Sequence, residues 1–187
     1  WYSRPFPIES DPAPLQPTPW LLGPCFNPMT SSNLPYQHLM TLQLDVDSAS
    51  SLPIGMTAKG RRTIAPIKGG HFEGAKLSGK VLPGGADWVI FRNDGVMKID
   101  VRLCLETDHG AHIYLSYEGQ FVAEAEALKA LASGAELAPE TYDLSVVARL
   151  ETGDESLRWL EDAIVVGTGK QSGFNPTYDF FVIGREP

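Results

Sequence analysis

Polar side chains that can do acid–base chemistry recur at every second position on either side of the turn "DHG". Asp100, Arg102 and Glu106 precede this turn, and His112 and Tyr114 follow it. A carboxylate beside an imidazole can share a proton with it and keep its titration near neutral pH. An arginine can hold a carboxylate or stabilise an enolate-like oxygen, and a tyrosine can donate a proton or a hydrogen bond. These residue types therefore favour proton transfer on a small molecule.

Two strands of one hairpin over residues 96–117 would bring these side chains together. Alternate positions of a strand lie on the same face, and a three-residue turn at "DHG" keeps every apolar residue of both strands on the opposite face. Directly opposite side chains in such a pair have Cβ atoms about 5 Å apart. The predicted pairs are Glu106 with His112, Cys104 with Tyr114, and Arg102 with Ser116.

The same alternation also describes the solvent-exposed face of an ordinary antiparallel sheet. In that reading the charged residues do no chemistry. Cys104 and Tyr114 are unusual on a fully exposed face, which favours a lined cavity. Both interpretations remain open on the hairpin pattern alone.

The rest of the chain beyond residue 37 is also rich in β patterns. Short apolar runs are separated by glycine and proline at intervals of about ten residues, as in sandwiches and barrels. Asp94-Gly95 is a strong hairpin-turn signal. The Ala-, Leu- and Glu-rich segment 121–134 predicts one helix, with Gly134 as its C-cap. Further strands are predicted at 39–47, 141–151 and 177–184, and a helical turn at 155–162.

Residues 1–37 differ from the rest and hold nine of the fifteen prolines. Proline at this density favours an extended arm over helix or central strand. The arm also carries aromatic and aliphatic side chains, so we expect it to pack on a barrel or on a partner subunit; a loose tail is the alternative. The predicted organisation is an arm over 1–37 and a β domain over 38–187.

Composition limits the partners. The chain of 187 residues has 43% hydrophobic residues and a net charge of −8, with a pI near 4.9. That charge disfavours nucleic acid and anionic membranes, and no apolar run approaches the roughly 20 residues of a membrane span. Because the chain begins at Trp1, we expect that an upstream segment was removed, and a cytoplasmic and a secreted location both remain open. Cys25 and Cys104 permit one disulfide without requiring it.

Several motifs of known chemistry fail on inspection. "GTGKQS" has Gln171 where a phosphate loop needs Ser or Thr, and "GGHFEG" lacks the spacing of a dinucleotide site. No G-x-S-x-G elbow is present. His109 and His112 are near Glu106, but a hairpin would place His109 at the turn and His112 on the ladder, so we expect no metal site. No cofactor is expected.

Three stretches carry a resemblance to a known family. They are "GRRTIAPIKGGHFEGAKLSGKVLPGGADW", "DGVMKIDVRLCLETDHGAHIYLSYEG" and "ETGDESLRWLEDAIVVGTGK". The chain resembles the domain of unknown function 3237 family from about Leu39 to Gly184. The resemblance implies a single antiparallel β-barrel, often oligomeric, with no settled activity. It implies that Gly69, Gly70, Gly84 and Gly85 lie at bulges and tight turns that close the barrel.

The resemblance also marks polar positions that would line the lumen of a small barrel. The chain departs from the family pattern at His71, His109 and Ser145, and in its proline-rich arm, so a relative's ligand need not be its own. The positions that match are Arg62, Glu73, Asp87, Trp88, Arg102, Glu106 and Tyr114.

The leading hypothesis is a cofactor-independent enzyme that isomerises, dehydrates or cyclises a small, largely apolar metabolite. Glu106 and His112 would act as acid and base, Asp87 as a second carboxylate, and Arg102 as oxyanion partner. A non-catalytic barrel that binds a hydrophobic molecule is the second hypothesis, and a structural, oligomer-forming protein with a solvated polar face is the third. The predicted substrate-binding residues are Trp88, Tyr114, Arg62, Glu73 and Asp100.

Overall fold

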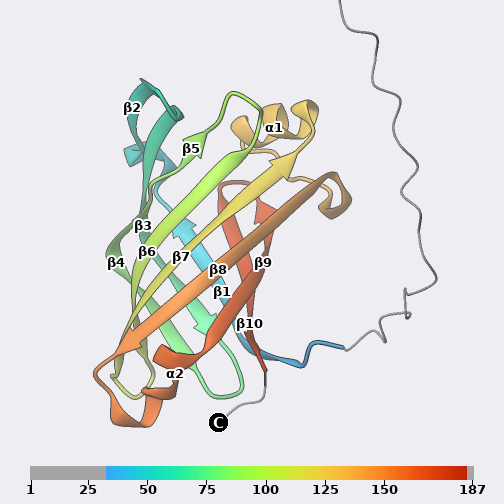
Figure 1. The fold of residues 1–187 in the computed structure, drawn as a ribbon. Coiled ribbons are helices and arrows are strands. Elements are labelled where there is room, and N and C mark those ends of the chain that lie inside the picture. Colours follow the sequence, from blue (N-terminus) through green and yellow to red (C-terminus); the bar gives the residue numbers. More distant parts are fainter. Residues whose placement is uncertain (1–32, 185–187) are drawn as a thin grey trace, which may run out of the picture. The chain divides into compact units, whose positions relative to one another are not determined.

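The computed structural model describes residues 33–184, which form a closed antiparallel barrel (Figure 1). Eight long strands follow the order β1-β10-β9-β8-β7-β6-β4-β3, and β1 also pairs with β3, which closes the sheet. The predicted mainly-β barrel is confirmed. The predictions for residues 1–32, which include most of the arm and Cys25, lie outside the described residues. The strands are β1 (Tyr36–Val46), β2 (Leu52–Thr57), β3 (Gly60–Glu73), β4 (Ser78–Asp87), β5 (Ile90–Phe91), β6 (Met97–Thr107), β7 (His112–Ala123), β8 (Tyr142–Thr152), β9 (Ile164–Ser172) and β10 (Asn175–Ile183).

Short helical elements lie between the strands: η1 (Ser48–Ser50), α1 (Ala125–Ala132), η2 (Pro139–Thr141), η3 (Glu155–Leu157) and α2 (Trp159–Asp162). The predicted helix over 121–134 begins four residues late, because Phe121–Ala123 continue β7 and pair with β8. Sheet pairing and the burial of Phe121 override local helix propensity there. Gly134 lies just beyond the helix with φ +75°, as expected for its C-cap.

The β6–β7 hairpin has the predicted register. Glu106 pairs with His112, Cys104 with Tyr114, and Arg102 with Ser116. The apolar face of the hairpin points into the barrel, where Leu103, Leu105, Ile113 and Leu115 are almost completely buried. Its polar face therefore points outward along this part of the wall.

Glycines bend the wall where the resemblance implied. The β3–β4 pairing shifts between Ile67 and His71, which flank Gly69 and Gly70. The β4–β6 pairing shifts between Leu82 and Ala86, which flank Gly84 and Gly85. At Gly70 φ is +143°, and a Cβ there would lie 2.1 Å from the Gln43 carbonyl oxygen. Only glycine allows this close approach of β1 and β3.

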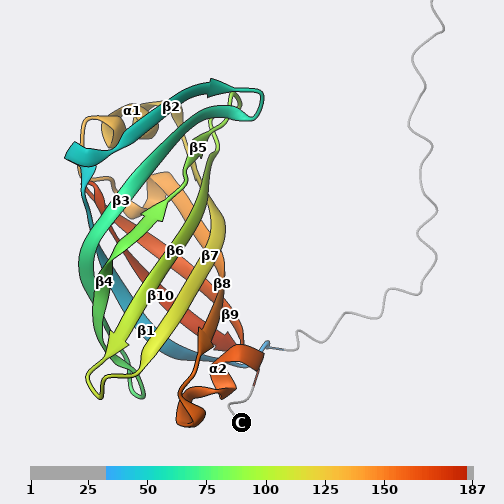
Figure 2. The ribbon, with the colours of Figure 1, turned by 90° about the vertical axis from the view of Figure 1, so that its left-hand side faces the viewer.

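The two ends of the barrel differ. At the end of the β6–β7 turn, also the end where α2 lies in Figures 1 and 2, side chains such as Phe72, Leu105 and Ile113 fill the interior. At the opposite end, where β2, β5 and α1 lie in both views, β4 stops at Asp87 and the two-residue β5 takes its place between β3 and β6. In the described residues no helix is long and apolar enough to span a membrane.

Candidate functional site

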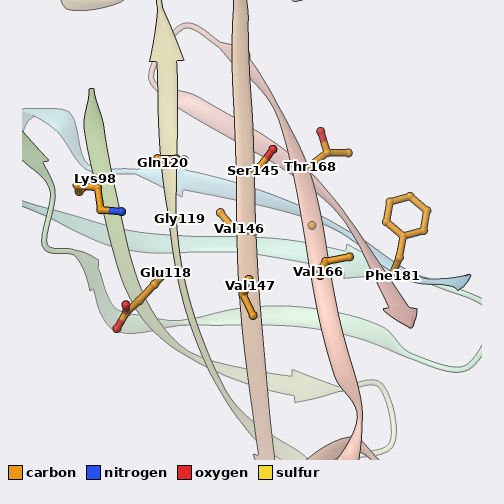
Figure 3. Close-up of a pocket in the computed structure, with 11 residues that line it drawn as sticks. Lys98, Glu118, Gly119, Gln120, Ser145, Val146, Val147, Val166, Thr168 and Phe181 are labelled. Atoms are coloured by element: carbon orange, nitrogen blue, oxygen red, sulfur yellow. The ribbon is translucent and has the colours of Figure 1, made fainter. Parts of the chain in front are cut away.

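Two hollows of similar size are present in the described part of the chain. One, of about 550 Å³, is a groove on the outer face of β7, β8 and β9, where Val147, Val166 and Phe181 are drawn in Figure 3. The other, of about 540 Å³, opens at the end of the barrel beneath α1 and is lined by the half-buried Asp87. We call the second hollow the mouth pocket and treat it as the candidate site.

Inward-facing residues of several strands build the mouth pocket. Alternate residues of β3 and β6 point into it, and α1 contributes two leucines. Most of the lining is apolar, which suits a small organic molecule with few polar groups. The principal contributors are Thr63, Ala65, Met97, Ile99, Leu128 and Leu131.

Asp87 is the acidic group of the mouth pocket. It ends β4, pairs with Ala65 and Val101, and lines the cavity. Its side chain is half-buried, with its remaining exposure toward the pocket. Desolvation by the surrounding protein is the largest cause that raises its pKa, to about 7, and the negative charge of Asp100 adds to the rise. Two contacts lower the pKa in part: the Asp100 N–H, which donates to Asp87 Oδ1 at 3.1 Å, and the positive charge of Arg62. Asp87 therefore exchanges a proton near neutral pH.

Two tyrosines belong to the same electrostatic environment. Tyr178 lines the mouth pocket, and the fully buried Tyr117 lies beside it with ring centroids 5.1 Å apart. The Tyr117 hydroxyl makes no hydrogen bond of ordinary geometry within the described residues, although the Tyr178 hydroxyl is close enough to affect its pKa. Burial raises the pKa of both tyrosines, and the Asp87 charge raises them further. Both phenols therefore stay protonated at neutral pH.

Neither tyrosine was predicted as a site residue, because each lies on an apolar strand face. Tyr117 alternates with Leu115, and Tyr178 alternates with Phe180. The sequence signal that could have identified them is a hydroxyl-bearing side chain on a strand face that is otherwise apolar. Gly169 pairs with Tyr178 on β9, and a Cβ on Gly169 would lie 3.0 Å from the Tyr178 ring. The glycine therefore leaves room for the aromatic ring.

Four predicted site residues contact one another around the part of the wall that carries Asp87. Arg62 Nη1 donates to the Trp88 carbonyl at 2.7 Å, and the Trp88 N–H donates to the Asp100 carbonyl at 2.8 Å. Arg102 pairs with Asp100 at 2.9 Å, and its guanidinium lies 5.1 Å from the centroid of the Trp88 ring. The structure thus brings together five of the nine predicted residues, of which Asp87 alone lines the mouth pocket. The other four hold the wall that carries it.

Glu106 and His112 form a separate pair on the outer face. Glu106 Oε1 lies 3.0 Å from Lys80 Nζ, and Glu106 Oε2 lies 3.7 Å from His112 Nε2. The hydrogen bond and charge of Lys80, with a smaller contribution from His112, lower the Glu106 pKa. The expectation that this polar face lines the interior is wrong, because Leu105 and Ile113 occupy the interior at these positions.

The remaining predicted residues also lie away from the mouth pocket. Tyr114 is exposed on the outer face beside Cys104, and Glu73 is exposed where β3 ends. Val101 pairs with Asp87, and Glu106 follows Val101 by five residues along β6. At about 3.3 Å per residue, roughly 17 Å separate the two backbone positions along the strand. In residues 33–184 no three His, Cys, Asp or Glu side chains gather closely enough to hold a metal ion.

Known proteins share this fold and much of this sequence. A UPF0311 protein of Rhodopseudomonas palustris is 34% identical over 124 residues, which are 66% of this chain and 78% of the relative. A β-barrel-like protein of Acinetobacter baumannii matches with a TM-score of 0.69 and 37% identity, over 80% of this chain and 97% of its own.

A fungal structure shows that the likeness of fold extends further than that of sequence. A protein of Penicillium herquei described as an enzyme matches with a TM-score of 0.60 and 16% identity, over 81% of this chain and 95% of its own. At that identity the likeness concerns the fold alone. The model of one family matches residues 35–183, as the sequence resemblance implied. The chain therefore belongs to the family described as "Protein of unknown function (DUF3237)".

Proposed function

We propose that the protein is a cofactor-independent enzyme that moves protons on a small, largely apolar metabolite bound in the mouth pocket. Asp87 is its acid and base. The observation that carries this proposal is a carboxyl group at the inner end of an apolar cavity of about 540 Å³, with its pKa raised to about 7. Near that pH both protonation states are populated, which suits general acid–base catalysis.

The tyrosine beside Asp87 supplies the complementary group. Tyr178 lines the cavity and keeps its proton, so it donates a hydrogen bond without accepting a proton in return. A donor fixed in apolar surroundings stabilises negative charge that develops on a substrate oxygen. Ionised Asp87 removes a proton from carbon or oxygen, and protonated Asp87 returns it elsewhere. Isomerisation, dehydration and cyclisation all fit this pair.

In this proposal the acid and base is Asp87, in place of the outer pair Glu106 and His112 that the sequence predicted. Arg102, first expected as an oxyanion partner, is paired with Asp100 and acts here as support. The likeness to the Penicillium herquei enzyme supports only that this barrel is compatible with catalysis. Assembly into a homo-oligomer stays a prediction.

A barrel that binds a hydrophobic molecule without changing it is the second candidate. The mostly apolar lining of the mouth pocket favours it, because such a lining suits retention as well as reaction. Only the fate of the bound compound separates the two functions.

The test is to incubate the protein with a metabolite extract of its native host and follow the mixture by liquid chromatography–mass spectrometry. Heat-treated protein is the control. Asp87→Asn and Glu106→Gln form a matched pair, because each replaces a carboxylate by an amide. We expect one compound to be consumed by the wild type and by Glu106→Gln at equal rates, and at least about 100-fold more slowly by Asp87→Asn.

Other outcomes decide against the proposal. Loss of turnover in Glu106→Gln or His112→Ala, with activity kept in Asp87→Asn, would return the chemistry to the outer face. A compound that co-purifies unchanged with the wild type would identify the protein as a carrier.

A further inference from the structure

An exposed cation, Arg61, stands at the rim of the mouth pocket. Arg61 lines the cavity, and its guanidinium lies 4.3 Å from the centroid of the Phe91 ring, which also lines it. β3 and β5 place the two residues directly opposite each other. Within residues 33–184 no carboxylate lies within ion-pair distance of Arg61. The aromatic contact fixes the guanidinium and leaves its donors available.

A second arginine of the same pocket is already neutralised. Arg92 also lines the cavity, but it is paired with Asp94 in the adjoining turn. The two arginines therefore differ in what they offer to a bound molecule. Arg61 offers a net positive charge to a bound molecule, whereas the charge of Arg92 is balanced by Asp94.

The position of Arg61 relative to Asp87 defines the length of a ligand that contacts both. Asp87 pairs with Ala65, and Arg61 lies four residues from Ala65 on β3. At about 3.3 Å per residue, roughly 13 Å separate the two positions along the strand. Arg61 is exposed at the rim, so an anionic group placed there keeps part of its water and avoids most of the cost of burial.

The charge of the whole protein makes this arrangement informative. A chain with a net charge of −8 repels anions at long range. Retention of a negatively charged molecule then depends on a local cation that no carboxylate of residues 33–184 pairs with. Arg61 is such a group, and the apolar wall below it suits a hydrocarbon body.

We propose that the substrate or ligand of the mouth pocket is an amphipathic anion, whose apolar body fills the cavity and whose carboxylate, sulfonate or similar group is bound by Arg61 at the rim. The end that reacts reaches Asp87, about 13 Å away. This inference rests on the proposed function of the same pocket and adds the class of molecule. Arg61 is then a specificity-determining residue.

The test uses two fluorescent probes that differ by one sulfonate group. 1-Anilinonaphthalene-8-sulfonate is anionic, and N-phenyl-1-naphthylamine is its uncharged counterpart. Dissociation constants for both are measured by fluorescence titration at pH 7.5 with the wild type and three variants. Arg61→Met keeps an apolar side chain over Phe91, the double variant Arg92→Met/Asp94→Asn is the matched control because it removes a balanced ion pair, and Val147→Lys alters the outer groove.

The expected result is a change confined to one probe and one variant. In Arg61→Met the anionic probe binds about fivefold more weakly, as for a partly exposed charge-assisted hydrogen bond. The uncharged probe changes by less than about twofold. Arg92→Met/Asp94→Asn and Val147→Lys leave the ratio of the two constants unchanged.

Failure of this inference is separable from failure of the proposed function. If both probes bind and Arg61→Met leaves their ratio unchanged, or Arg92→Met/Asp94→Asn changes it equally, the anion site is overturned while Asp87 catalysis stands. If Val147→Lys displaces both probes, they bind the outer groove and the assignment to Arg61 is overturned. If neither probe binds the wild type, both the anion site and the mouth pocket as a binding site fail.

Discussion

The backbone positions of Asp87 and Glu106 lie about 17 Å apart along the same wall, and their surroundings give the two carboxylates opposite properties. Glu106 stands on the outer face, where Lys80 and His112 stabilise its charge and lower its pKa. Asp87 faces the mouth pocket, where desolvation raises its pKa to about 7. Glu106, which the sequence pattern placed beside His112, is thus the carboxylate that is held in its ionised form. Proximity of Glu to His is less informative than the side of the wall on which a carboxylate lies.

The largest effect should come from the contrast between the filled and the open end of the barrel. Leu105→Ala removes a fully buried side chain at the filled end and should lower the free energy of unfolding by about 3 kcal/mol. Leu128→Ala removes the same atoms beside the mouth pocket, where a cavity already exists, and should cost about 1 kcal/mol. Urea denaturation measures both. Equal costs would contradict the difference between the two ends.

Removal of the Asp87 charge and removal of the Glu106 charge should change the free energy of unfolding in opposite directions. The Asp87 pKa is about 7 in the fold and near 3.8 when unfolded, so the folded chain binds more protons between these values and loses stability as pH rises from about 4 to 7. A shift of about three pKa units sets an upper bound of about 4 kcal/mol, which water in the pocket reduces. Asp87→Asn should therefore stabilise the protein by about 1–3 kcal/mol at pH 8 and far less at pH 4.

Glu106→Gln is the control for that prediction. The Glu106 pKa is lowered in the fold, so its contribution to stability is present above its unfolded pKa and is lost as pH falls through its folded pKa. The amide should leave stability nearly unchanged or slightly lower at pH 8. Urea denaturation of the wild type and both variants at pH 4 and pH 8 makes the comparison. A destabilised Asp87→Asn at pH 8 would show that the ionised carboxylate supports the fold.

The smallest effect tests the support behind Asp87. Arg62 lowers the Asp87 pKa and holds the Trp88 carbonyl. Arg62→Met should raise the Asp87 pKa further, by about half a unit, because it removes a nearby positive charge. Titration of the carboxyl carbon by NMR measures this shift, and Lys80→Met serves as a control that should move the Glu106 pKa and leave that of Asp87 unchanged. A fall of the Asp87 pKa in Arg62→Met would contradict the stated cause.

Much of the fold follows from the sequence because its signals are local. Alternation and the turn "DHG" determine the register of β6 and β7, and Asp94-Gly95 marks the turn before β6. The site is harder to predict because it depends on which face of that register points inward. At the filled end only the apolar face fits inside, so Glu106 is excluded. Asp87 lies inward because it is six residues from the buried Val81 on β4, and the pairing shift between Leu82 and Ala86 keeps this even spacing. What the pattern of β4 does not reveal is the desolvation of Asp87, which comes from residues of other strands packed around it.

Closure of the barrel by β1 and β3 has a consequence for contacts between molecules. The closed sheet has no edge strand among its eight long strands, whereas β2 pairs with β3 alone and leaves its other edge unpaired within the described residues. β2 is short and exposes Leu52, Ile54 and Met56, a composition that invites strand addition by another chain. Pro53 lacks an N–H donor, and the register shift before Gly55 distorts the edge. Pro53 and Gly55 therefore protect this edge of the barrel against pairing with an edge of another molecule.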